Sequence, residues 1–178
     1  MKAASEVVAL LQELVGIPSH ENEGAVVDLL CGRFRERGIP FETRLVGPPG
    51  RANVIASWGR GEPSLILNSH MDTVAPGDPA GWQSPPLAAE IRDGRLYGRG
   101  SADAKGPLAA MIVAFESIRR SHPRLQGRLI LTAVAYEEES GLGTQAEVAA
   151  GARADAAIVG EPTNLQVCVA HRECCACA

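Results

Sequence analysis

The sequence predicts an α/β domain whose mixed, largely parallel central sheet carries helices on both faces. Helical and strand-like segments alternate along the 178 residues, and clusters of glycine and proline separate them. The run Leu65–Leu67 is apolar on both faces, as expected for a central strand that helices cover on each side. A chain of this length is long enough for one domain with its own core.

Four segments predict helices. The first begins at Ser5, the expected N-cap, and places its apolar residues on one face. The second covers about 23–37 and ends at Gly38. A long helix is expected over about 105–120, and a short one over about 145–150. Each amphipathic helix needs a sheet to cover.

Short apolar segments between these helices predict the strands of that sheet. They lie at 41–46, 53–58, 64–68, 129–135 and 156–159. Gly59-Arg60-Gly61 separates the second strand from the third. A further hairpin is expected from strands 89–92 and 95–97, because Asp93-Gly94 between them is a strong two-residue turn signal.

Composition narrows the function classes. With 46% hydrophobic and 21% charged residues, the chain has the composition of a soluble globular protein. A net charge of -4 gives no electrostatic case for nucleic acid. No apolar run approaches the roughly 20 residues that span a membrane, and the N-terminus lacks signal-peptide features, so we expect a cytoplasmic protein. Cys174, Cys175 and Cys177 are too crowded for a good tetrahedral metal site.

Acidic and imidazole side chains follow three of the predicted strands. His70 and Asp72 come after strand 64–68, Glu137 and Glu138 after strand 129–135, and Glu161 after strand 156–159. Ligands of open α/β sheets bind at the carboxyl ends of the strands, so these residues should converge there. Sites of this composition suit a divalent metal.

Each fragment alone has an ordinary structural reading. Asp103 precedes a predicted helix and could be only its N-cap. The acidic run Glu137–Glu139 could be only solvated surface. The glycines before Lys105 suggest a phosphate-binding loop, but neither common glycine-rich phosphate pattern is present, so we discard that reading.

Together the fragments resemble one family. Four stretches carry the resemblance: Leu65–Val74, Gly98–Gly106, Glu137-Glu138 with Gly143 downstream, and Val159–Thr163. In this order and spacing they resemble the catalytic domain of the M20 zinc aminoacylases and peptidases, which include acetylornithine deacetylase, succinyl-diaminopimelate desuccinylase and carboxypeptidase G2. The resemblance covers residues 1–171.

The resemblance implies metal ligands. His70 and Glu161 would bind one zinc ion, Asp103 would bridge to a second, and Glu138 would bind that second ion. Cobalt or manganese would fit the same ligands. The implied reaction is hydrolysis of an amide bond in an N-acyl amino acid or small peptide.

The resemblance also implies roles beside the metals. Glu137 would be the general base, Asp72 would orient His70, and the Asp103-Ala104 peptide would be cis. Tyr136 stands where the family usually has Asp, so a rival alignment makes Glu138 the base and Glu139 the ligand. The first assignment needs no gap before Gly143.

Family members are roughly twice as long. The resemblance implies a dimerisation domain, a homodimer, and a last metal-binding histidine in a returning catalytic segment; we expect these to be absent from this sequence. Residues 172–178 form an atypical tail after the truncated catalytic domain of residues 1–171. We therefore expect weak or single metal occupancy and very low catalysis from the 178-residue chain. Two alternatives are a remnant that only binds metal or a partner, and a structural domain with accidental acidic loops.

Overall fold

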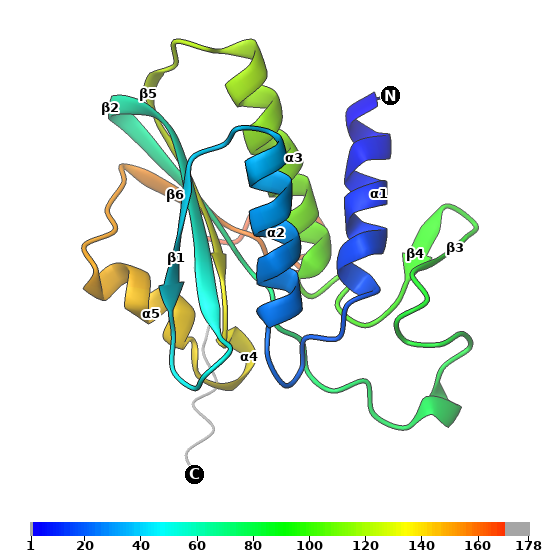
Figure 1. Ribbon diagram of the computed structural model, residues 1–178. Helices are drawn as coiled ribbons and strands as arrows, with labels where there is room; N and C mark the ends of the chain where they lie inside the picture. The colour runs from blue at the N-terminus through cyan, green and yellow to red at the C-terminus, as the bar shows by residue number, and fades with distance from the viewer. Residues whose placement is uncertain (1, 170–178) are drawn as a thin grey trace.

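The computed structural model describes residues 2–169 (Figure 1). Its elements, in chain order, are α1 (Lys2–Val15), α2 (Gly24–Glu36), β1 (Phe41–Leu45), β2 (Ala52–His70), the 3-10 turn η1 (Pro79–Gly81), β3 (Glu90–Arg92), β4 (Arg95–Tyr97), α3 (Lys105–Ser121), β5 (Gln126–Val134), α4 (Glu137–Ser140), α5 (Leu142–Ala149) and β6 (Ala156–Val159). The expected tail at 172–178, with its cysteines, lies outside the described residues. None of the helices described is long and apolar enough to span a bilayer.

The main sheet is mixed. β1 runs antiparallel to β2, and β6 runs parallel to β2. Along the first part of β2, which starts near Val54 opposite Ala133, the paired residues of β5 have decreasing numbers. Along the last part, which ends at His70 opposite Val134, they have increasing numbers. The two arms of β2 therefore lie on opposite sides of β5, the first running against it and the second alongside it.

The strand break expected at Gly59-Arg60-Gly61 is wrong in detail. Strand geometry continues through these residues, and β2 is one element of 19 residues. The chain does reverse there: Gly59 has φ +81 and lies so close to β5 that an added Cβ would meet the Gly127 carbonyl oxygen. The glycines thus allow a reversal inside a strand where the sequence predicted a gap between two strands.

Helices cover both faces of this sheet, which confirms the predicted fold class. α1, α2 and α3 lie together on one face, where α2 and α3 contact β2 and α3 also contacts β5 (Figure 1). On the other face, the Asn53 amide of β2 donates to the Gly143 carbonyl at 2.8 Å and to Glu147 at 2.7 Å, which fixes α5 there.

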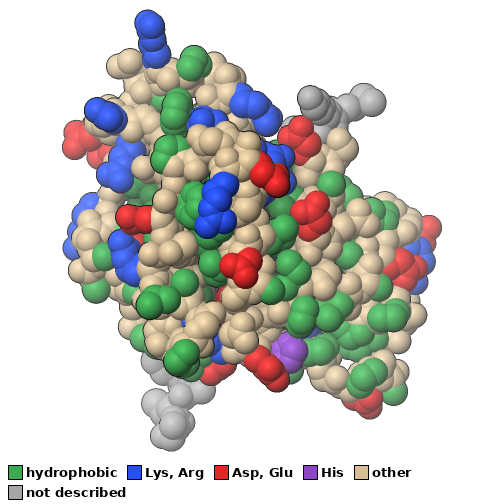
Figure 2. Space-filling model, viewed as in Figure 1, with side chains coloured by type: hydrophobic (Ala, Val, Ile, Leu, Met, Phe, Trp, Pro, Cys, Tyr) green, Lys and Arg blue, Asp and Glu red, His purple; other side chains and the backbone are tan. Residues whose placement is uncertain are grey.

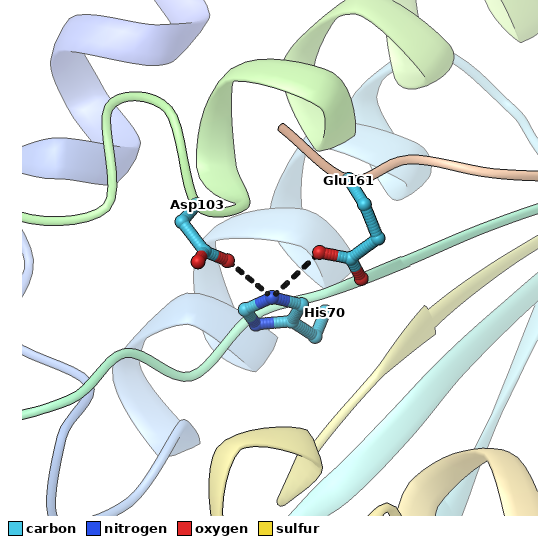
Figure 3. A group of neighbouring side chains, drawn as sticks. All are labelled: His70, Asp103 and Glu161. Atoms are coloured by element: carbon cyan, nitrogen blue, oxygen red, sulfur yellow. Dashed lines mark hydrogen bonds and ion pairs between the residues drawn. The ribbon is translucent and has the colours of Figure 1, made fainter. Parts of the chain in front are cut away.

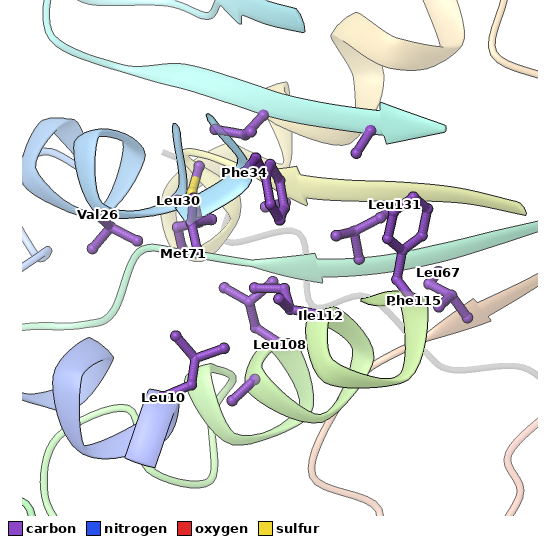
Figure 4. Packing of buried hydrophobic residues seen from close by; sticks show 14 of the residues in the cluster. Leu10, Val26, Leu30, Phe34, Leu67, Met71, Leu108, Ile112, Phe115 and Leu131 are labelled. Carbon is purple, nitrogen blue, oxygen red and sulfur yellow. The ribbon is translucent and has the colours of Figure 1, made fainter. Parts of the chain in front are cut away.

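A single apolar core lies between the sheet and the first three helices (Figure 4). Its largest buried side chains are Leu10, Leu14, Leu30, Phe34, Met71, Leu108, Ile112, Phe115 and Leu131. Burying one such side chain contributes about 1.5–3 kcal/mol. This core keeps the carboxyl ends of the strands in fixed positions relative to the start of α3.

Two local expectations differ from the structure. Ser5 lies inside α1 rather than at its N-cap, because the helix begins at Lys2 and Ala3 and Ala4, which favour helix strongly, precede Ser5. The acidic run after β5 forms the short helix α4 between Tyr136 and Gly141, both in the left-handed region. The hairpin is confirmed, with Asp93 and Gly94 at φ 51 and 73 in its turn.

Charged side chains of both signs are distributed over the face shown in Figure 2. Strand β6 is exposed along its whole length, with Ile158 at 52% and Val159 at 58% exposure. The sheet therefore presents apolar side chains to solvent at this edge of the described residues.

Candidate metal centre

Three segments far apart in sequence bring side chains together at the carboxyl ends of the strands. His70 ends β2, Asp103 lies in the turn before α3, and Glu161 follows β6. The Nε2 atom of His70 is 3.0 Å from Oδ1 of Asp103 and 3.9 Å from Oε2 of Glu161 (Figure 3). One ligand atom from each residue fits within 4.8 Å of the other two. The Asp103-Ala104 peptide is cis, as expected.

The orientation of His70 leaves one ring nitrogen free for a metal. The side chain is 1% exposed, and its Nδ1 lies 3.0 Å from the carbonyl oxygen of Asp72. Because a carbonyl only accepts, Nδ1 carries a hydrogen, and Nε2 is the nitrogen that faces Asp103. In the protonated ring Nε2 donates to Oδ1 of Asp103, and once it loses that proton its lone pair is available to a metal. The carboxylate of Asp72 is farther, at 3.6 Å from Nδ1, and its other oxygen accepts the Glu138 amide at 3.0 Å.

Three successive glutamates of α4 point to three different neighbours. Oε2 of Glu137 is 3.9 Å from Nε2 of His70. Oε1 of Glu138 accepts the Val74 amide at 3.2 Å, beside the loop that follows β2. Glu139 is exposed and reaches Arg51 at 3.5 Å. The divergence follows from the helical turn of α4, which separates adjacent side chains by about 100°.

Negative charge around His70 controls its protonation. Burial alone lowers the pKa of His70, but contact with Asp72 and the charges of Asp72 and two nearby glutamates raise it to about 9. The metal-free imidazole is therefore protonated at neutral pH. A metal ion must displace that proton from Nε2.

The carboxylates repel one another. Burial raises the pKa of Glu161; the charge of His70 opposes this increase, and Asp103, Glu137 and Glu138 add to it. Burial likewise raises the pKa of Glu138, and Asp103 adds to that shift. A divalent cation offsets such clustered negative charge, and an imidazole with several carboxylates is a donor set that zinc, cobalt and manganese accept. The residues present therefore fit a metal ion.

Ser69 and Gly160 hold two of these loops together. The Ser69 hydroxyl lies 3.2 Å from the Ala104 carbonyl oxygen and 3.1 Å from that of Gly160. Gly160 packs so tightly that an added Cβ would lie 2.7 Å from Cβ of Pro107. Sequence reasoning missed Ser69, because a serine near the end of a strand carries no signal of its own.

The sequence suggests a phosphate-binding loop at Lys105, but the structure places this side chain against the end of α1. Its side chain is 1% exposed, and Nζ donates to the carbonyl oxygens of Leu14 at 2.9 Å and Ile17 at 2.7 Å. Burial lowers the pKa of Lys105 to about 8. The ammonium group thus fastens the start of α3 to the end of α1.

The fold brings an imidazole and two carboxylates together at the carboxyl ends of the strands, a donor set that fits a divalent metal ion. The profile described as Peptidase family M20/M25/M40 matches residues 66–173, more than half of the sequence. The chain belongs to this peptidase family, as its motifs indicated.

Solved structures share the fold at low sequence identity. An M20 family metallo-carboxypeptidase from Sulfolobus solfataricus has a TM-score of 0.73 and 22% identity, over 87% of this chain and 37% of its own. Human carnosine dipeptidase 1 has a TM-score of 0.66 and 24% identity, over 81% of this chain and 34% of its own. A dipeptidase from Saccharomyces cerevisiae has a TM-score of 0.71 and 16% identity, over 90% of this chain and 39% of its own. The chain thus spans well under half the length of these proteins.

Proposed function

We propose that this chain carries the metal-binding and proton-transfer residues of a metal-dependent hydrolase that cleaves amide bonds in small peptides or N-acyl amino acids. The observation that supports this most is the convergence of His70, Asp103 and Glu161 within 4.8 Å, at the carboxyl ends of the strands. Membership of a peptidase family gives the reaction class.

His70, Asp103 and Glu161 would hold one divalent ion, with zinc favoured by the mixed nitrogen and oxygen ligands. Asp103 and Glu138 would contribute to a second ion, whose imidazole the family resemblance assigns to a later segment. A bound ion of this kind polarises the amide carbonyl and lowers the pKa of bound water toward 7. We expect single or weak occupancy in the 178-residue chain, because among the described residues only His70, Asp103 and Glu161 bring three ligand atoms within 4.8 Å of one another.

Glu137 is the proposed general base. Its Oε2 lies 3.9 Å from Nε2 of His70, on the side of the ring that faces the proposed metal ligands. From there its carboxylate can take a proton from the attacking water and return it to the leaving amine. The rival alignment would make Glu139 a ligand, but Glu139 points to Arg51. Asp72 is proposed to orient His70 and, through its other oxygen, the Glu138 amide.

Two further features stay predictions from the resemblance: the catalytic-domain boundary at residue 171 and a homodimer. A cytoplasmic location stays a prediction from the sequence itself. Acyl amino acid and peptide substrates both remain within the proposal. Binding of a metal ion or a partner without catalysis is the second candidate.

Calorimetric titration of the dialysed chain with zinc tests the metal site. We expect one site that is lost in His70→Ala, while Glu139→Ala binds zinc as wild type does. Failure of wild type to bind zinc would overturn the metal centre, and two tight sites would overturn the expected occupancy.

Turnover tests the reaction and the assignment of the base. Dipeptides and acetyl, succinyl and glutamyl amides are assayed with the 178-residue chain and with any longer product of the same gene. Where hydrolysis is measured, Glu137→Ala should lower kcat by about 100-fold or more, and Glu139→Ala should leave it unchanged. The reverse pattern would support the rival alignment.

A further inference from the structure

Tyr136 joins β5 to α4 in a conformation that few residues adopt. Its φ of 58 and ψ of 42 lie in the left-handed region, which costs a residue with a side chain more than it costs glycine. The next residue is Glu137, the proposed base. The backbone angles of Tyr136 therefore set the direction in which Glu137 leaves the sheet. Such a conformation persists where the surrounding structure enforces it.

A buried ion pair holds the Tyr136 backbone. The Tyr136 amide donates to Oε1 of Glu23 at 3.1 Å, and the same oxygen accepts Nη1 of Arg51 at 2.7 Å. Glu23 is completely buried and Arg51 is 6% exposed. Arg51 is itself fixed by donating Nη2 to the carbonyl oxygen of Glu21 at 2.6 Å. Two residues from the first third of the chain thus reach the residue beside the base.

The aromatic ring of Tyr136 is held by the same arginine. The guanidinium carbon of Arg51 lies 4.1 Å from the ring centroid, a cation–π contact. A Cβ added at Gly47 would lie 3.4 Å from the ring, so the ring packs closely against that backbone. Two residues further along, the Glu138 amide donates to Asp72. Carboxylates therefore accept backbone amides at both ends of the segment Tyr136–Glu138.

The ion pair is poorly explained as a source of stability alone. A buried pair usually gains little over well-packed apolar side chains, because both charges lose their hydration. Within the described residues, Oε2 of Glu23 is buried and has no hydrogen-bond partner, which adds to that cost. Another ion pair with a buried carboxylate, Glu116 with the partly exposed Arg33 at 2.7 Å, lies between α2 and α3 and makes no contact with α4 among those described.

We propose that Glu23 and Arg51 are positioning residues: they hold Tyr136 in the left-handed conformation and thereby direct the Glu137 carboxylate at His70. The proposal rests on the function proposed above only for the role of Glu137. The conformational part depends on the Glu23, Arg51 and Tyr136 contacts alone.

The test compares Glu23→Ala, Glu23→Gln and Arg51→Ala with the control Glu116→Ala, which breaks the ion pair with Arg33 between α2 and α3. Nuclear magnetic resonance of the whole 178-residue chain reports the backbone angle of Tyr136 through its couplings and the hydrogen bond through the shift of its amide proton. Co2+ added to the same samples reports the position of Glu137 through metal-induced shifts.

In Glu23→Ala and Arg51→Ala we expect the Tyr136 couplings to leave the left-handed range and the Co2+-induced shifts of Glu137 to change, with Co2+ affinity retained. Glu23→Gln keeps an acceptor for the Tyr136 amide, so its effect should be smaller. Glu116→Ala should lower the unfolding temperature without moving either signal. Adding Tyr136→Gly, which tolerates the left-handed region, should restore the Glu137 shifts in Glu23→Ala.

Unchanged Tyr136 and Glu137 signals in folded Glu23→Ala would overturn the proposal, and so would equal changes in Glu116→Ala. If wild type fails to bind Co2+, the proposed metal centre is wrong, and the Tyr136 couplings still decide whether the ion pair sets the backbone. The two proposals therefore fail separately.

Discussion

The pKa of His70 makes the stability of the metal-free chain depend on pH. The pKa is about 9 in the folded protein, against an ordinary value of 6.5. Because the folded state binds this proton more tightly, the stabilising contribution is complete below pH 6.5 and is lost as the pH rises through 9. A difference of about 2.5 pKa units corresponds to on the order of 3 kcal/mol. For a domain of this size that is roughly 6–12 °C in Tm.

Urea and thermal unfolding of the chain in excess chelator, at several values between pH 6 and pH 9.5, measure this effect. His70→Gln serves as the reference, since it removes the titrating ring and leaves the other groups in place. The difference in unfolding free energy between wild type and His70→Gln should shrink as the pH rises. Parallel stability curves for the two proteins would refute the reasoning, because His70 would then titrate alike in the folded and unfolded chain.

Metal binding should show the opposite pH dependence. A divalent ion needs the neutral imidazole, so its apparent affinity should rise by about tenfold per pH unit up to about pH 9. Competition between Co2+ and a chelator of known affinity gives this slope. An affinity that is independent of pH between 6.5 and 8.5 would mean that metal binding displaces no proton from His70 in this range.

Two further substitutions test how the centre is held. Lys105→Met leaves the carbonyl oxygens of Leu14 and Ile17 without their donor, which should cost about 2–4 kcal/mol. As the pH rises from 8 to 10.5, the unfolding free energy of wild type should increase relative to that of Lys105→Met, because the folded state loses the Lys105 proton at a lower pH than the unfolded state does. Denaturant unfolding measures both effects. Gly160→Ala forces a Cβ against Pro107 and should cost about 1–3 kcal/mol and weaken metal binding by displacing Glu161. Gly32→Ala, where an added Cβ meets nothing within 4 Å, is its control and should stabilise α2 by up to about 1 kcal/mol; unweakened metal binding in Gly160→Ala would contradict the packing argument.

The side chains proposed to act directly at the site could be placed from sequence. His70, Asp103, Glu137 and Glu161 stand at the ends of apolar strands or before an amphipathic helix, and that placement indicates convergence before any contact is known. The family motifs then give each residue a role. The structure brings these side chains to one edge of the sheet, as expected.

Residues that act through a distant backbone could not be predicted in this way. In the sequence Glu23 is an ordinary acidic residue near a helix start, and Arg51 is an ordinary basic residue before a strand. Their proposed role becomes apparent only from the hydrogen bond that the Tyr136 amide donates to Glu23. Lys105 likewise contacts carbonyl oxygens of α1, far away in sequence. The left-handed angle of Tyr136 was invisible because aromatic residues rarely adopt it.

The two arms of β2 have a consequence for how the chain folds. Because β5 pairs with both arms, Val54 has only its β1 partner Thr43, and His70 lacks its partner Val134, until residues 126–134 arrive. Until then the arms are separated by the width of a missing strand, about 10 Å between their backbones. The sheet that carries His70, the proposed metal ligand, must therefore close by long-range contacts, which form slowly during folding. On the ribosome, the binding site cannot assemble before the last third of the described chain emerges.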